Sequence, residues 1–143
     1  EVESLYCKLM MLIQKLAECG LIHGDFNEFN LMMRCQEPYE LVLIDFPQMI
    51  STNHSNAEEY YERDVECVRR WFLRKFGYEH HDAQSHGDVP RLENIQRNDL
   101  HLDTVVEASG FDPKLRRQVI IRNREQSAAA TEEESQECLS NTD

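Results

Sequence analysis

The stretch HGDFNEFN, residues 23–30, constrains the fold of this chain more than any other part of the sequence. It holds an aspartate, a glutamate and two asparagines, and it lies between two strongly apolar patterns. Polar side chains next to buried elements cost free energy unless they bind a partner. We therefore interpret this stretch as a functional loop that regular elements hold on both sides.

The residues before the loop have the period of an amphipathic helix. Apolar side chains recur three or four residues apart from Val2 to Leu16, with polar side chains between them. Gly20 follows, and glycine often ends a helix because it readily adopts a left-handed conformation. The sequence predicts a helix that stops just before Gly20.

Two short apolar runs after the loop predict a β-hairpin. They cover residues 30–34 and 40–46 and flank a turn at 35–39 that contains Pro38. The second run ends at Asp45. We expect this hairpin to bring Asp45 close to the polar loop.

A second long helix is predicted after a polar loop at residues 51–56. Ser55 and Glu58 fit a capping box at its start, and Gly77 marks its end. Its apolar side chains, which form one stripe broadened by two aromatic residues, are Tyr61, Val65, Val68, Phe72, Trp71 and Phe76.

The rest of the chain is more polar. Residues 78–90 are predicted as a surface loop and residues 92–110 as one or two short helices. Asp112 and Pro113 then form a good start for a helix that reaches about Arg124. The small and acidic residues 127–143 predict a disordered tail. We expect an α+β fold, mainly helical with one hairpin, divided into 1–111, a C-terminal helix at 112–126 and the tail at 127–143.

Composition narrows the class of protein further. A length of 143 residues suits one modest domain, and a net charge of −12 argues against nucleic-acid binding by bulk charge. The five cysteines form no C-x-x-C pair, which predicts reduced thiols rather than disulfides or a zinc site. No apolar run approaches the length of a membrane-spanning helix. The chain begins on Glu1 inside a helical pattern, so we expect a fragment of a longer protein.

Three oxygen-bearing side chains form the candidate site: Asp25, Asn30 and Asp45. Asp25 and Asn30 lie five residues apart in one loop, and the hairpin returns Asp45 to it. Two carboxylates and an amide oxygen are ligands of the type that Mg²⁺ prefers, and they leave positions for phosphate oxygens. A carboxylate that the metal does not use fully could orient or deprotonate an attacking hydroxyl or water.

The spacing is that of the protein-kinase catalytic loop, Asp-x-x-x-x-Asn, followed by a metal-binding Asp-Phe-Gly. Gly24 stands where an Arg usually follows the His, Pro47 replaces the Gly, and no Ala-Pro-Glu follows. With these departures, LIHGDFNEFNLM and LIDFPQMIST resemble the RIO family of atypical protein kinases. IDFPQM and NAEEYYERDVECVRRWF are similar to its second subgroup. The resemblance covers residues 1–111.

This resemblance implies a protein-kinase-like C-lobe and a role for each site residue. Asp25 matches the catalytic aspartate, and Asn30 and Asp45 match the residues that bind Mg²⁺ and ATP. Asp45 is also implied to accept the phosphoryl group transiently. The chain has no glycine-rich phosphate loop and no strand lysine, so the winged-helix domain and nucleotide-binding N-lobe of the subgroup are missing from it.

The resemblance also implies a cellular role. Members of the subgroup act as ATP-driven switches on the maturing small ribosomal subunit, which implies a pre-40S particle, with its RNA and proteins, as partner. A cytoplasmic location with passage through the nucleus follows. Two alternatives stay open: a catalytically silent fragment that serves as a binding module, and the lobe of a small-molecule phosphotransferase.

Other polar residues near the motif have two interpretations each. His23 is either a packed histidine that bonds local backbone, which we favour, or an acid–base group. Glu28 is either a surface charge or a contact to substrate or backbone. Asp64 either bonds the backbone of the catalytic loop and holds it rigid, or is simply exposed.

Two further charged groups lie outside the motif. The histidines and aspartates of the 78–90 segment fit no zinc spacing and predict a polar connector; they are His80, His81, His86, Asp82 and Asp88. Basic residues on the 112–126 helix either contact RNA phosphates or form a solvated face; they are Lys114, Arg116, Arg117, Arg122 and Arg124.

Overall fold

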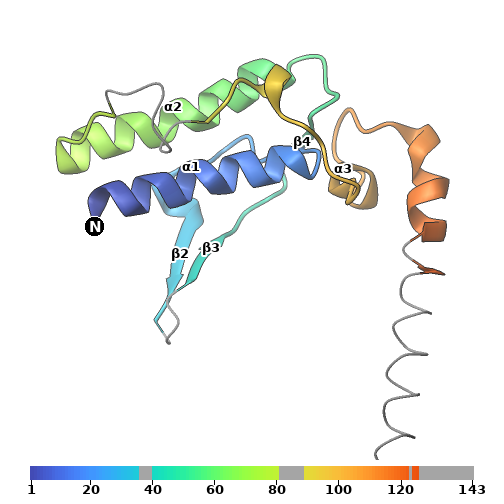
Figure 1. Cartoon of the computed structure of the whole chain (residues 1–143), viewed down its shortest axis with the longest axis horizontal. Coiled ribbons are helices and arrows are strands. Elements are labelled where there is room, and N and C mark those ends of the chain that lie inside the picture. Colours follow the sequence, from blue (N-terminus) through green and yellow to red (C-terminus); the bar gives the residue numbers. More distant parts are fainter. Residues whose placement is uncertain (36–39, 81–88, 123, 126–143) are drawn as a thin grey trace, which may run out of the picture. The chain divides into compact units, whose positions relative to one another are not determined.

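The computed structural model of the chain describes residues 1–35, 40–80, 89–122 and 124–125. It divides into two units, Glu1–Phe111 and Asp112–Asp143. The predictions for the turn at 36–39, for residues 81–88 and for the tail at 127–143 lie outside the described residues. The main helices and most strands of the first unit, which carries the candidate site, are labelled in Figure 1.

Two long helices, α1 (Val2–Glu18) and α2 (Ala57–Phe76), pack against each other and form the main body of this unit (Figure 1). Both end as the sequence predicts. Gly20, just beyond α1, has a φ of 88°, and Gly77 at the end of α2 has a φ of 59°. These values lie in the left-handed region that glycine adopts with little steric cost.

The start of α2 differs from the prediction. Asn56, not Ser55, occupies the N-cap position, and no side chain caps the helix. The capping-box prediction is therefore wrong. The carbonyl of His54 accepts the Ala57 N–H at 3.0 Å, so a backbone turn leads into the helix one residue later than expected. Glu58 in the first turn still interacts favourably with the positive end of the helix dipole.

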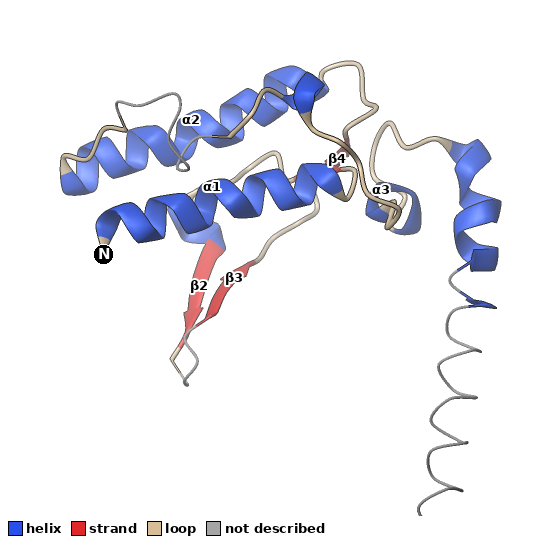
Figure 2. Cartoon of the chain, viewed as in Figure 1, coloured by secondary structure: helices blue, strands red, loops and turns tan. Residues whose placement is uncertain are grey.

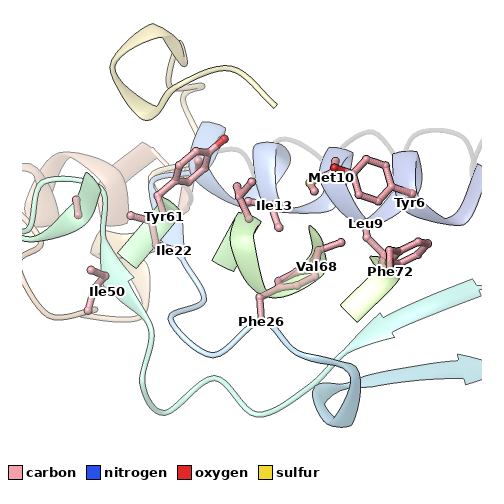
Figure 3. Close-up of a cluster of buried hydrophobic side chains, with 13 residues drawn as sticks. Tyr6, Leu9, Met10, Ile13, Ile22, Phe26, Ile50, Tyr61, Val68 and Phe72 are labelled. Carbon is pink, nitrogen blue, oxygen red and sulfur yellow. The ribbon is translucent and has the colours of Figure 1, made fainter. Parts of the chain in front are cut away.

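The hydrophobic core lies between α1 and α2 (Figure 3). Leu9 and Ile13 come from α1, and Val68 and Phe72 come from α2, as the predicted stripes require. Phe26 joins them from the polar loop and is fully buried. This side chain anchors in the core the same loop that carries the candidate site.

The predicted β-hairpin is confirmed. Strands β2 (Leu31–Arg34) and β3 (Glu40–Leu43) lie side by side (Figure 2) and pair antiparallel. Leu31 lies opposite Leu43. The second strand ends two residues before Asp45, earlier than predicted.

A second small sheet was not predicted. Strands β1 (Leu21–Ile22) and β4 (Ile50–Ser51) pair antiparallel. The prediction of a polar loop is wrong at Ser51, which is buried in β4. Its hydroxyl donates a hydrogen bond to the Asp103 carboxylate at 2.6 Å, and this partner makes burial of the polar side chain possible.

Short helices complete the first unit: η1 (Glu28–Asn30), η2 (Leu92–Asn94) and α3 (Leu102–Val105). The last two confirm the short helices predicted for residues 92–110. The cysteines of the described part, Cys7, Cys19, Cys35 and Cys67, are free thiols.

The second unit is helical over residues 113–122. Its first turn has the predicted cap, because the Asp112 carboxylate accepts the Lys114 N–H at 2.9 Å. In the part of the chain that the structure describes, no helix combines the length and apolar character needed to cross a bilayer.

Candidate active site

The polar loop turns sharply at Gly24, directly before Asp25. Gly24 has a φ of 83°, and an added Cβ would lie 2.9 Å from the Gln48 carbonyl oxygen. Both the conformation and the close approach favour glycine at this position. The turn leaves the Asp25 side chain exposed, while the neighbouring His23 and Phe26 are buried.

Asp64 of α2 holds the backbone on both sides of Asp25. One carboxylate oxygen accepts the Gly24 N–H at 2.9 Å and the other accepts the Phe26 N–H at 3.1 Å. The side chain is 2% exposed. The prediction that Asp64 bonds the loop backbone is therefore confirmed, and the alternative of an exposed aspartate is wrong.

Burial raises the pKa of Asp64, because the charged carboxylate loses contact with water. The two backbone N–H groups and the nearby His23 and Arg63 act in the opposite direction and lower the same pKa. Burial is the larger effect. The net result is a pKa above the ordinary value for aspartate.

Asp25 and Asn30 are brought together directly. The Asn30 amide nitrogen donates to the Asp25 carbonyl oxygen at 2.9 Å and to the Asp25 carboxylate at 3.1 Å. The other Asp25 carboxylate oxygen accepts a hydrogen bond from the Asn27 side chain at 2.8 Å. These contacts fix the orientation of the Asp25 carboxylate within the loop.

The same contacts decide which way the Asn30 amide faces. Both of its partner atoms on Asp25 are acceptors, so the amide nitrogen must point toward Asp25. The amide oxygen then has no hydrogen-bond donor among the described residues. An oxygen in this state suits a hard cation such as Mg²⁺.

Ile44, the residue before Asp45, makes two hydrogen bonds with the polar loop. The Ile44 N–H donates to the Asn30 carbonyl at 2.9 Å, and the Ile44 carbonyl oxygen lies 3.0 Å from His23 Nε2. The chain thus returns to the loop immediately before Asp45, as the hairpin predicted.

Asp45 itself has features of a ligand. Its φ of 65° is left-handed, which costs a residue with a Cβ roughly 1 kcal/mol. Its carboxylate is exposed and makes no hydrogen bond or ion pair with any residue that the structure describes. Strained backbone of this kind is common where a side chain must reach a ligand. Asn30 and Asp45 therefore fit a Mg²⁺ ion by the chemistry of their free oxygen atoms.

His23 is a packed side chain. It is 1% exposed, its Nδ1 accepts the Asp25 N–H at 3.3 Å, and its Nε2 faces the Ile44 carbonyl. Its ring also packs edge-on against Phe26 and Phe46. These contacts confirm the favoured interpretation of a histidine that bonds local backbone.

Glu28 forms an ion pair with a residue of α2. Its carboxylate lies 3.6 Å from the Arg74 guanidinium of α2, and its side chain is partly exposed. This ion pair ties the first turn of η1 to the end of α2.

Three contributors to the site were missed by the sequence analysis. Asn27 caps η1 through the Phe29 N–H at 3.0 Å and also holds Asp25. The Gln48 side chain donates to the Asp45 carbonyl, and the Arg63 guanidinium donates to the Gly24 carbonyl. Asn27 could have been found, since an asparagine side chain in a loop often accepts a hydrogen bond from the backbone N–H two residues further on. Nothing local identifies the other two.

The remaining charged groups are only partly described. His80 accepts or donates a hydrogen bond with the Tyr78 hydroxyl at 3.1 Å and stacks on Tyr6. His81, Asp82, His86 and Asp88 lie outside the described residues. Within the described ranges, no group of three or more His, Cys, Asp or Glu side chains could hold a metal. Lys114, Arg116 and Arg117 are exposed on the helix of the second unit.

Comparison with known proteins gives a family. The model of the RIO domain matches residues 1–85. The serine/threonine-protein kinase RIO2 of Caenorhabditis elegans is 50% identical over 112 residues, which cover 78% of this chain and 20% of that protein. The corresponding rio2 kinase of Schizosaccharomyces pombe is 45% identical over 113 residues, which cover 78% of this chain and 30% of that protein.

A solved structure of a Rio2 kinase is also similar to this chain. The Rio2 kinase of Chaetomium thermophilum, in a complex with ADP/Mg²⁺ and phosphoaspartate, matches with a TM-score of 0.60 and 38% identity. The match covers 88% of this chain and 40% of that chain. The chain thus spans between a fifth and two fifths of the length of these relatives.

Helices α1 and α2, the hairpin and the loop between them define a protein-kinase-like fold. The chain belongs to the RIO family, and the relatives reported above are serine/threonine-protein kinases of the RIO2 kind.

Proposed function

We propose that this chain is the catalytic C-lobe of a RIO-type kinase and ATPase that transfers the phosphoryl group of ATP in the presence of Mg²⁺. The observation that carries the proposal is the arrangement around Asp25. Its carboxylate is held by Asn27 and Asn30, while the side-chain oxygen atoms of Asn30 and Asp45 accept no hydrogen bond from the described part of the chain.

The proposed roles follow from these positions. Asn30 and Asp45 hold the Mg²⁺ ion, which neutralises phosphate charge when it is bound. Asp25, exposed and oriented by its two amide donors, positions an attacking hydroxyl or water and accepts its proton. The phosphoaspartate in the Rio2 complex of Chaetomium thermophilum supports a further role for Asp45 as transient acceptor of the phosphoryl group.

The first prediction concerns Asp45 in the full-length protein. Asp45→Ala removes a metal ligand and not a core residue, so Mg²⁺-dependent ATP turnover should fall by at least about 100-fold with little change in thermal stability. Asp45→Asn, which tolerates the left-handed backbone, should lose turnover as well. Steady-state ADP release measures the turnover of each variant, and a thermal melt measures its stability.

The matched control is Asp99→Asn, which alters an exposed aspartate in the segment before α3 and should leave turnover unchanged. Undiminished turnover in both Asp45 variants would end the assignment. A full-length wild type without Mg²⁺-dependent turnover would instead favour the silent binding module. The match to RIO kinases supports the kinase over a small-molecule phosphotransferase.

We extend the proposal to a partner and a location. By family resemblance the full-length protein acts in maturation of the small ribosomal subunit, binds pre-40S particles, and is mainly cytoplasmic with passage through the nucleus. We predict that it sediments with small-subunit precursors in a sucrose gradient, and its presence only among free proteins would contradict this.

The triple variant Lys114→Gln, Arg116→Gln and Arg117→Gln tests the role of the basic helix. If these side chains contact RNA phosphates, the variant should associate more weakly with the precursors. If they form only a solvated face, the association should not change.

A further inference from the structure

Each of the four polar groups in the two peptide units that flank Asp25 has a side-chain partner. Before Asp25, the Gly24 carbonyl accepts from Arg63 and the Asp25 N–H donates to His23 Nδ1. After it, the Asp25 carbonyl accepts from Asn30 and the Phe26 N–H donates to Asp64. Since these two peptide planes set the direction of the Asp25 side chain, the four contacts together aim its carboxylate.

Arg63 reaches this peptide unit from α2, and its guanidinium is held in place by an aromatic ring. Its guanidinium carbon lies 4.4 Å from the centre of the Tyr60 ring, on the same helix. The Tyr60 ring in turn lies against Gly24, 3.4 Å from the position that a Cβ would take there. An arginine stacked on an aromatic ring loses little further freedom when it donates a hydrogen bond.

We propose that Arg63 is a positioning residue for Asp25: by holding the Gly24 carbonyl from the face of Tyr60, it sets the direction of the Asp25 carboxylate. The inference rests on the proposed function of Asp25. Arg63 touches neither the reacting atoms nor the proposed metal ligands. It acts only through the peptide unit that precedes Asp25.

Arg63 also supports Asp64, its neighbour along the helix. Its positive charge lowers the pKa of Asp64 against the larger effect of burial. A charged Asp64 can accept both the Gly24 and the Phe26 N–H groups. Consecutive residues of α2 thus hold both polar groups of Gly24, the carbonyl through Arg63 and the N–H through Asp64.

The test uses the full-length protein with Arg63→Met, Arg63→Lys and the control Arg70→Met. Arg70 lies on the same helix and pairs with Glu66 at its exposed surface. We expect Arg63→Met to lower kcat for ATP turnover by about tenfold or more, since small misplacement of a reacting group costs this much. The KM for ATP and the Mg²⁺-dependent affinity for ATP, measured by calorimetry, should change less than about twofold.

Arg63→Lys keeps a positive donor but cannot stack in the same way, so its kcat should fall about threefold, between those of wild type and Arg63→Met. Hydrogen exchange at the Phe26 amide should become faster in both Arg63 variants and remain unchanged in Arg70→Met. If Arg63→Met does not fold, Arg63→Lys decides alone: a roughly threefold loss of kcat at constant KM supports the proposal, and a wild-type kcat overturns it.

A purely structural role for Arg63 predicts a different result. Arg63→Met would then melt at a lower temperature but keep a wild-type kcat per folded molecule, and that outcome overturns the proposal. Failure of the proposed function is recognised separately, because wild type would then show no Mg²⁺-dependent turnover or Asp25→Asn would leave turnover intact. Turnover that requires Asp25 but not Arg63 removes only the present inference.

Discussion

Asp64 shows how one buried charge can organise a loop. Each of its two carboxylate oxygens accepts a backbone N–H from the loop, so the side chain has no unused acceptor toward Gly24 or Phe26. An asparagine at this position would offer only one acceptor and would turn an N–H toward a second donor. The residue type is therefore dictated by the geometry of the loop rather than by the helix on which it lies.

The raised pKa of Asp64 predicts how stability depends on pH. Its folded pKa lies above the unfolded value of about 3.9, so the folded state holds the proton more tightly. The contribution of Asp64 to the free energy of unfolding is then fully present below about pH 4 and falls as the pH rises through the folded pKa.

Urea denaturation of wild type and Asp64→Asn between about pH 4 and pH 7 measures this dependence. The amide side chain of the variant cannot titrate, so the stability advantage of wild type over the variant should shrink toward neutral pH. At neutral pH the variant should nevertheless be the less stable protein, because it lacks one of the two acceptors of the charged carboxylate. An advantage that grows with pH would show that the hydrogen bonds, and not burial, control the pKa.

At the scale of elements, α1 and α2 are stable because each turns an apolar stripe toward the other. Phe72 of α2 is fully buried, and its ring meets Tyr6 of α1 edge-on at 5.2 Å between centroids. Leu73, the next residue, is 50% exposed. The two residues share a helix and differ in which face they occupy.

This contrast gives a matched pair of variants. Phe72→Ala should lower the free energy of unfolding by about 3–5 kcal/mol, because it opens a cavity between the two helices. Leu73→Ala should lower it by less than about 1 kcal/mol. Chemical denaturation of both variants measures the difference, and equal losses would show that the helices do not pack through this face.

The hairpin and the helix ends were predictable at this same scale. Helix periods, the glycines at the helix ends and the turn between two apolar runs are local signals, and each of these elements formed, although β3 ends earlier than its apolar run indicated. Two predictions failed, one through a local turn and one through a tertiary contact. A backbone turn at His54 places the start of α2 one residue later than predicted. A hydrogen bond to Asp103 satisfies the Ser51 hydroxyl, which lies buried in a strand instead of in the predicted loop.

For the Glu1–Phe111 unit as a whole, the buried Asp103 carboxylate connects segments that are far apart in the sequence. Asp103 of α3 is fully buried, accepts the Ser51 hydroxyl of β4 and pairs with Arg97 at 2.7 Å. An added Cβ on Gly20, beyond the end of α1, would collide with both charged side chains. The pair therefore lies where three elements meet.

Asp103→Asn should be strongly destabilising for that reason. It leaves the Arg97 charge without its partner, and we expect a loss of about 3 kcal/mol in the free energy of unfolding. The control is Glu40→Gln, which breaks the exposed pair with Arg34 at 3.0 Å and should cost less than about 1 kcal/mol. Chemical denaturation measures both, and comparable losses in the two variants would contradict the structural role of the buried pair.

The sequence by itself determined the helices, the hairpin and the grouping of Asp25 with Asn30, because each depends on residues close together in the chain. Only the tertiary structure decided what holds that group in place. Asp64 reaches the loop across 40 and 38 residues, and Arg63 reaches it across 39. Such contacts depend on how α2 packs against the loop, and packing between distant segments leaves no periodic signal in the sequence.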